Sequence, residues 1–435
     1  MTIDFDVLPV ILGWIAVLFA LYFLLYYKFL YSIIDPLFSW VFATSFASFL
    51  AIEVIPNTED IVHFFGCQLF LWFGFVVAYR NFSFRDSVPV PSEQKFDFYD
   101  VSLLRWTTYT LLVLYIFSNI IIGYSKGFAL LSDTPTESKI ANFQQGFGIF
   151  RKINWSAGTF VGVSLVYLYL TKKNKSYLFL LMVVAFFSSL DGSKSALIKI
   201  AISSGLVLYH PAFASEKLVL KKFQRYLPVA IFASLGIAFT VLTKENGDLG
   251  GAFLGFIKRF LYSADSLLYY YQPVNIAYFE KYSSLDYISV VTNPILGFLR
   301  LQPYKEAIGN IMVDNLRMPG NNSSITVGPN APFYIEGRIY FYYWASFPFS
   351  MLVGYIYASM RTYFFSLNRS SAFYFVYMAS FLHLAGAILG DVNLAVTQSF
   401  DLFFFVVPTY IGISFFLTRK IKIRLNTKAL KTSGL

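Results

Sequence analysis

The chain has 435 residues, of which 57% are hydrophobic and only 13% are charged. Soluble domains carry roughly 25% charged residues, and a mean hydropathy of +0.59 means more apolar surface than a water-soluble fold can bury. Composition therefore excludes an ordinary soluble enzyme and indicates an integral membrane protein with a net charge of +10.

Hydrophobic runs long enough to cross roughly 30 Å of hydrocarbon follow one another along almost the whole chain. The first run has no basic segment before it and no small-residue cleavage site after it, so we expect a retained helix. About eleven transmembrane helices are predicted, at residues 7–27, 36–55, 61–79, 104–123, 154–170, 176–190, 195–213, 227–243, 338–360, 371–392 and 400–418. The fold class is therefore all-α, with one polytopic membrane domain over residues 1–435.

The Lys and Arg residues set the orientation, because cytoplasmic loops near helix ends are enriched in them. The tail after residue 418 has six basic residues and no acidic one, which places the C-terminus in the cytoplasm. Counting back through eleven spans puts the basic loops at 172–175, 217–225 and 361–369 on the same side. The acidic N-terminus, with Asp4 and Asp6, then lies outside.

Two predicted outer loops, 124–153 and 244–337, are long enough to fold against the membrane, and loops of this length are usually functional. Within the larger loop, residues 251–272 place apolar side chains at helical spacing and predict an amphipathic helix in the interface. Residues 302–332 are rich in Gly, Pro and Asn and indicate an ordered loop.

Charged residues at membrane depth are costly and usually functional, and most of those in this chain lie near predicted outer helix ends. We expect a shared polar cavity there; the alternative is that each charge reaches the interface independently. The residues concerned are Glu53, His63, Asp191, Lys194, Lys199, Glu336, Arg338, Asp391 and Asp401. Arg and Lys at this interface suit a lipid with a pyrophosphate head, and a carboxylate can take the proton of an attacking sugar hydroxyl. Cys67 and the three histidines lack metal-ligand spacing, so neither a metal site nor a cofactor is expected.

Several short motifs accompany this topology. They are Gly-Ser-Lys-Ser at 192–195, Lys258-Arg259, Asn321-Asn322, Gly328-Pro329 and Glu336-Gly337. With the many helices and the long late outer loop, they resemble the Wzy-type O-antigen or oligosaccharide repeat-unit polymerases of bacteria. In similar polymerases an Arg often stands at the position of Lys194, where this chain keeps only the charge.

The resemblance implies a GT-C-like, metal-independent glycosyltransferase of the bacterial inner (cytoplasmic) membrane. It transfers a growing glycan from undecaprenyl pyrophosphate to the terminal sugar of another lipid-linked repeat unit. The implied catalytic carboxylates are Asp265, Glu336 and Asp391, and the implied pyrophosphate-binding residues are Arg151, Lys194, Arg259, Arg300, Lys305 and Arg338. For Arg151 an interfacial anchor beside Trp155 is an equal alternative.

Implied partners are lipid-linked oligosaccharides, membrane lipids and a protein that regulates chain length, but no nucleic acid. Two other functions stay open from the sequence. An O-antigen ligase would share the fold and the lipid donor. A secondary transporter is the second alternative, although the chain shows no related halves and places its polar groups at the outer end.

Overall fold

The computed structural model describes residues 8–82, 98–133, 138, 141–142, 147–191, 196–246, 248–261, 264–303, 305–317, 328–367 and 370–432. Across these residues the regular secondary structure is helical and no strand occurs. The prediction of an all-α chain is therefore confirmed for the part that the structure describes.

Seven stretches of the described residues are long and apolar enough to cross a membrane. They comprise α1 (Leu8–Tyr26) with η1 (Tyr27–Phe29), α2 (Pro36–Val54), α3 (Thr58–Ala78), most of α4 (Phe98–Lys126) with η2 (Ala129–Leu131), α6 (Gly148–Lys172), α16 (Ala372–Ala385) with η5 (Gly386–Leu389), and the first part of α17 (Val392–Thr432). The other four predicted spans also fall on helices: α7 (Ser176–Leu190), α8 (Ala196–Leu208), α9 (Lys217–Asn246) and α15 (Phe333–Phe365). The chain is thus a polytopic helical protein.

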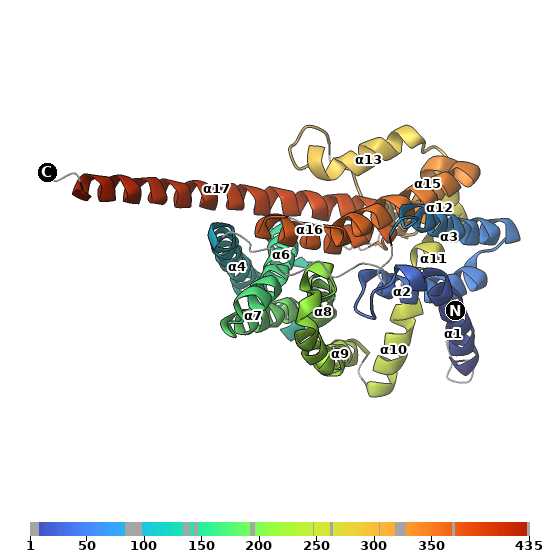
Figure 1. The fold of residues 1–435 in the computed structure, drawn as a ribbon. Helices are drawn as coiled ribbons and strands as arrows, with labels where there is room; N and C mark the ends of the chain where they lie inside the picture. Colours follow the sequence, from blue (N-terminus) through green and yellow to red (C-terminus); the bar gives the residue numbers. More distant parts are fainter. Residues whose placement is uncertain are drawn as a thin grey trace.

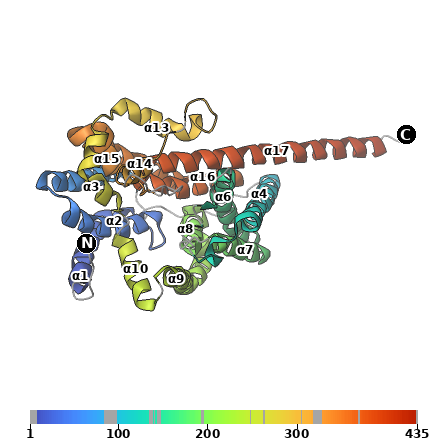
Figure 2. The same ribbon diagram turned by 180° about the vertical axis from the view of Figure 1, so that it is seen from behind.

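The helices form two groups, which Figures 1 and 2 show from opposite sides. One group contains α1, α2, α3 and α15, and the other contains α4 and α6 to α9. The segment from α16 through η5 to α17 runs between them, and α17 extends well beyond the other helices (Figure 1).

Helices α3 and α15 pack at very close range through a pair of glycines. A Cβ added at Gly74 would lie 2.2 Å from the Met351 carbonyl oxygen, and one added at Gly354 would lie 2.3 Å from the Leu71 carbonyl oxygen. Only glycine permits this backbone approach. The contact holds the N-terminal group of helices against α15, which carries Glu336.

The large loop contains α10 (Leu249–Leu261), α11 (Ser266–Tyr270), α12 (Pro273–Phe279), α13 (Ser284–Leu296) and α14 (Ile308–Asp314). The predicted amphipathic segment 251–272 is therefore two helices, α10 and α11. The apolar face of α10 packs on protein: the Phe256 ring lies 5.2 Å from Phe239 of α9, and the Phe260 ring 5.5 Å from Phe46 of α2. The loop expected at 302–332 also contains a helix, α14, whose apolar side packs inward at Ile308 and Met312.

Helix α15 bends sharply at Tyr342, where φ is 59° in the left-handed region that bulky residues rarely adopt. The bend brings residues on its two sides together, since Phe341 and Phe349 stack with their centroids 4.7 Å apart. The short segment 333–341 is thereby separated from the long segment 343–365. Glu336 and Arg338, two of the predicted site residues, lie on the short segment.

Candidate functional site

Two of the three predicted catalytic carboxylates lie in one buried region. Glu336 is in the first turn of α15 and is 2% exposed. Asp391 lies between η5 and α17, where its carboxylate accepts a hydrogen bond of 2.8 Å from the Leu394 N–H and so caps α17. Glu336 accepts hydrogen bonds from the backbone of Val392 and Asn393, the two residues that follow Asp391, so the two carboxyls lie close together.

Burial sets the protonation of both groups. It raises the pKa of Glu336 well above its usual range, and the charge of Asp391 raises it further. Burial also raises the pKa of Asp391, to about 6, against the opposing effect of backbone hydrogen bonds, first that of Leu394. The pair therefore combines a carboxyl that favours its protonated form with one that ionises near neutral pH.

Tyr287 completes this cluster from α13. Its hydroxyl donates a hydrogen bond of 3.4 Å to Glu336 Oε2, and its ring packs 5.2 Å from Tyr340 and 5.3 Å from Phe349. Helix α13 begins with a capping box in which Ser283 and Asp286 bond to each other's backbone N–H groups. This cap orients α13, so that a residue of the large loop reaches a carboxyl of α15.

A pocket of about 490 Å³ is lined in part by Tyr340, whose ring packs against Tyr287. Its lining residues are Lys281, Tyr282, Asp286, Val290, Lys305, Glu306, Ile308, Ile311 and Tyr340. Lys305 Nζ donates to Ser289 Oγ, and its backbone N–H donates to Asn293 Oδ1 at 3.2 Å. The pocket thus places two lysines beside the Tyr287 and Glu336 cluster.

Asp286, at the edge of this pocket, remains ionised. The hydrogen bonds that it accepts from the Ser283 side chain and backbone lower its pKa, and the charge of Lys305 lowers it further. The pocket therefore holds fixed charges of both signs.

Arg338 is on the same short segment as Glu336 but contacts a different helix. Its guanidinium forms an ion pair of 3.3 Å with Asp60 of α3 and lies 5.4 Å from the Tyr343 ring centroid. His63, another predicted outer residue, is buried nearby and bonds to Ser346 at 2.6 Å. This arrangement fastens α15 to α3.

The remaining predicted cations are spread over the surface. The Arg151 guanidinium lies 4.3 Å from the Trp155 ring centroid, which is the contact expected of an interfacial anchor. Arg259 is exposed on α10, and Arg300 is exposed after α13 with φ of 58°. Lys194 lies outside the described residues, and its role stays a prediction.

Two predicted carboxylates lie outside the Glu336 cluster. Asp265 precedes α11, and burial raises its pKa to about 6. Asp401 of α17 pairs with Lys152 of α6 at 2.7 Å. Lys152 also lies 5.2 Å from the Phe298 ring centroid, so the pair connects α6, α17 and the residues after α13.

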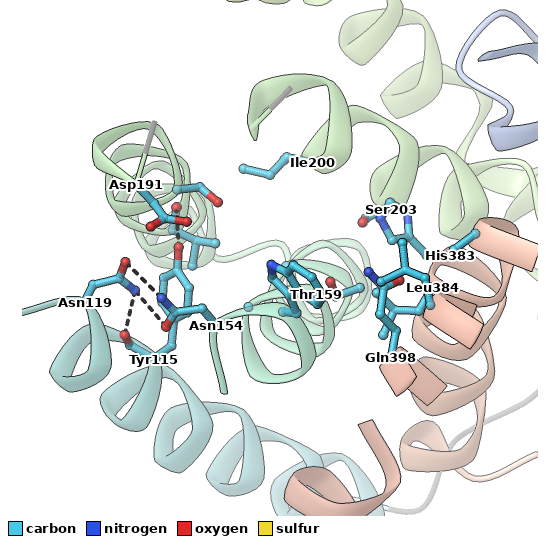
Figure 3. A pocket seen from close by; sticks show the side chains of 17 residues that line it. Tyr115, Asn119, Asn154, Thr159, Asp191, Ile200, Ser203, His383, Leu384 and Gln398 are labelled. Atoms are coloured by element: carbon cyan, nitrogen blue, oxygen red, sulfur yellow. Dashed lines mark hydrogen bonds between the residues drawn. The ribbon is translucent and has the colours of Figure 1, made fainter. Parts of the chain in front are cut away.

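A second cavity, of about 370 Å³, lies within the C-terminal group of helices (Figure 3). It is lined by residues of α4, α6, α7, α8, α16 and α17 together with Asp191 and Ala387. Its polar lining residues include Asn119, Asn154 and Gln398, which the sequence did not single out because uncharged side chains give no signal at helix ends. Leu394, the residue whose N–H bonds to Asp391, also lines it.

Among the described residues no group of three or more His, Cys, Asp or Glu side chains could hold a metal ion. Comparison with protein-family models, with curated proteins and with solved structures finds no match. The functional assignment therefore depends on the residues of this chain.

Proposed function

We propose that this protein polymerises undecaprenyl-pyrophosphate-linked oligosaccharide repeat units at the outer face of a bacterial inner membrane. The observation that carries the proposal is the buried cluster of Glu336, Asp391 and Tyr287 beside a lysine-lined pocket. A polymerase needs a carboxylate base and cations for a pyrophosphate leaving group, and this region offers both.

In the proposed reaction Asp391 is the base, because a carboxyl with a pKa of about 6 is largely ionised at neutral pH. The acceptor sugar hydroxyl attacks the anomeric carbon of the donor glycan and gives its proton to Asp391. The bond from the anomeric carbon to the pyrophosphate oxygen breaks, and the pyrophosphate leaves with the electron pair. Glu336, held by Tyr287, positions the acceptor by hydrogen bonding.

Lys305 is the predicted pyrophosphate ligand that lies in the pocket next to this cluster, and Lys281 joins it there. Arg338 is proposed to contribute less to pyrophosphate binding, because its charge is balanced by Asp60 in an ion pair. Arg151 is proposed as an interfacial anchor on Trp155. Arg259, Arg300 and Lys194 remain proposed contacts of the carrier lipid head. These cations neutralise the leaving group, so we propose that transfer needs no divalent metal.

The proposed topology has eleven spans in a GT-C-like arrangement, with an outer N-terminus and a cytoplasmic C-terminus. The helices α7, α8, α9 and α15 supply the four spans beyond the seven long apolar stretches. Helices α10 to α14 then belong to the outer loop, 244–337. This placement puts Glu336, Asp391 and the lysine pocket on the outer face, where lipid-linked repeat units are presented.

The test replaces Asp391 with Asn and Glu336 with Gln in cells that lack the native gene, with Asp314→Asn as the matched control. Asp314 pairs with Arg317 within one turn at the end of α14, outside the proposed site. Loss of a general base lowers transfer by about 10²–10⁴-fold. We expect Asp391→Asn cells to cap their surface lipid with a single repeat unit, while Asp314→Asn cells keep long chains.

The same experiment separates the alternatives. A ligase defect leaves long chains on the carrier lipid, and a transporter defect leaves repeat units facing the cytoplasm. Long surface chains in the Asp391→Asn and Glu336→Gln variants, at normal protein levels, would contradict the proposed site.

A further inference from the structure

The cavity in Figure 3 is formed where six helices meet at one end of their bundle. Its lining comes from the C-terminal parts of α4, α7 and α16 and from the N-terminal parts of α6 and α8 and the first turns of α17. Because these helices alternate in direction, the C-terminal parts of three and the N-terminal parts of the other three lie at the same end of the bundle. Under the proposed topology this is the outer end of the bundle.

The cavity extends along α6. Along α6 it is lined by Asn154, Trp155, Gly158, Thr159 and Gly162, which form one face of the helix over about 12 Å. Gly162 is buried, yet a Cβ added to it would meet no atom within 4 Å. A volume of about 370 Å³ lies at the lower end of the ~300–1,000 Å³ range of small-molecule sites.

The polar lining is mostly uncharged. Figure 3 shows Asp191, Asn119 and Asn154 on one side of the space and Ser203, His383 and Gln398 on the other. None of the lining residues that the structure describes is Lys or Arg. Asn119 already donates to the Tyr115 carbonyl at 2.8 Å and to Asn154 at 3.2 Å. The lining as a whole suits hydroxyls, which both donate and accept hydrogen bonds, whereas a pyrophosphate would find no cation among the described lining residues.

The cavity is also connected to the proposed base. Leu394 lines the cavity with its side chain and bonds to Asp391 through its N–H, and Ala387 of η5 lines it from the preceding turn. The segment from α16 to α17 therefore both contributes to the lining of the cavity and carries Asp391.

We propose that this cavity binds a single uncharged sugar unit of the glycan substrate, separately from the lysine-lined pocket that receives the anionic head. The identity of the glycan rests on the proposed function, but binding of a neutral sugar can be measured without transfer.

The first test uses the fact that Cys67 is the chain's only cysteine. In a Cys67→Ser background, Gln398→Cys places a thiol in the cavity, and its modification by N-ethylmaleimide is timed with purified protein in nanodiscs. The probe is the free repeat-unit oligosaccharide released by mild acid from the host's own carrier lipid. The control variant is Lys244→Cys, at an exposed residue of α9 outside the cavity.

We expect saturating oligosaccharide to slow modification of the Gln398→Cys thiol by about tenfold, as a site mostly occupied by ligand requires. Inorganic pyrophosphate should leave that rate unchanged, and the Lys244→Cys thiol should respond to neither probe. A Gln398→Cys rate that the oligosaccharide does not change, or one slowed by pyrophosphate, would overturn the proposal.

The second test fills the cavity. Gly162→Leu extends into empty space and favours the helix, so the protein should fold, while transfer should fall at least about tenfold through lost binding. Gly13→Leu on the exposed face of α1, where an added Cβ also meets nothing within 4 Å, is the matched control and should transfer normally. Normal transfer by folded Gly162→Leu protein would contradict the inference while leaving the proposed function intact.

If wild-type protein itself makes no polymer, the proposed function fails, and the thiol measurement still decides the cavity's ligand.

Discussion

Two carboxyls of similar chemistry differ in protonation because their surroundings differ. Glu336 is 2% exposed, and burial together with the charge of Asp391 keeps its pKa well above the usual range. Asp391 keeps hydrogen bonds from the backbone at the start of α17, which hold its pKa to about 6. Paired titratable groups whose environments separate their pKa values are typical of acid and base pairs in active sites.

The first prediction concerns the pH dependence of transfer. Asp391 must be ionised to accept a proton, and its pKa is raised to about 6, so activity should be low below that pH and rise as the pH passes through it. The measurement is kcat/KM for transfer by purified protein between pH 4.5 and 8. Asp286, whose pKa is lowered, stays ionised throughout and contributes no such change. A profile without a rise near pH 6 would remove Asp391 from the role of base.

The second prediction concerns Tyr287. Tyr287→Phe removes the hydroxyl that donates to Glu336 but keeps the ring packing against Tyr340 and Phe349. A lost hydrogen bond of this kind costs roughly 0.5–1.5 kcal/mol, which predicts a several-fold loss of kcat/KM. Tyr124→Phe, at a tyrosine of α4 that is 93% exposed and lies outside the proposed site, is the control. Equal activity of wild type and Tyr287→Phe would show that this hydroxyl plays no part in positioning Glu336.

At this scale the sequence could identify charged residues but not their partners. Glu336 and Asp391 stood out because ionisable groups at helix ends are costly in a membrane. Tyr287 did not, because one of 32 tyrosines carries no signal until α13 folds against α15. Arg338 was predicted as a pyrophosphate ligand, and the sequence could not show its ion pair with Asp60, because the two residues are 278 positions apart.

Individual helices are held together by a buried ion pair at the end opposite the proposed site. Arg361, near the end of α15, makes two hydrogen bonds of 2.7 Å to Asp35, and both side chains are 0% exposed. Its Nε also donates to Tyr79 at 3.0 Å, and Nη2 donates to the Phe29 carbonyl at 2.8 Å. One guanidinium thus connects α15 to the ends of α1 and α3 and to the N-cap of α2.

The third prediction tests this connection. Arg361→Ala leaves the Asp35 carboxylate buried without its cation, and such a loss costs about 3–5 kcal/mol of the free energy of unfolding. Thermal denaturation in detergent should show a large fall in Tm, and the double variant Asp35→Asn, Arg361→Met should recover part of it. Arg80→Ala, at an exposed position after α3, is the control and should change Tm little. An unchanged Tm for Arg361→Ala would contradict this account.

Helix positions were largely predictable from hydrophobic runs, but their ends and contacts were not. All eleven predicted spans contain helix in the structure, because apolar length is a strong signal. The amphipathic pattern of 251–272 correctly indicated helix but missed the break before α11. Its side chains Phe256 and Phe260 contact Phe239 and Phe46, and the placement of α10 in the membrane interface stays a prediction. Helix α14 escaped notice because its seven residues are too few to show a period.

Over the whole molecule, the proposed transfer requires the site to lie on the outer face of the membrane. The two helix groups meet at the segment from α16 to α17 (Figure 1), which carries Asp391, the proposed base, and contributes Ala387 and Leu394 to the lining of the cavity in Figure 3. This cavity and the lysine-lined pocket both need to face the side on which lipid-linked repeat units arrive.

The fourth prediction therefore concerns topology. A reporter fused after Leu435 should be active in the cytoplasm, and one inserted near Gly247 should be active only outside, because the basic loops follow the rule for cytoplasmic segments. Insertion of the same reporter near Lys173, in the basic loop between α6 and α7, gives a cytoplasmic reference. A cytoplasmic signal from the Gly247 insertion would place the proposed site on the wrong face.

Transfer by the isolated protein tests the proposed polymerase activity without other components of the cell. Purified protein in nanodiscs is given lipid-linked repeat units with excess chelator, and the products are separated by length. The account predicts glycans of two or more units on the carrier together with released undecaprenyl pyrophosphate, and a rate lowered by about 10²–10⁴-fold in Asp391→Asn. No chain extension by wild-type protein, or extension that Asp391→Asn leaves unchanged, would contradict it.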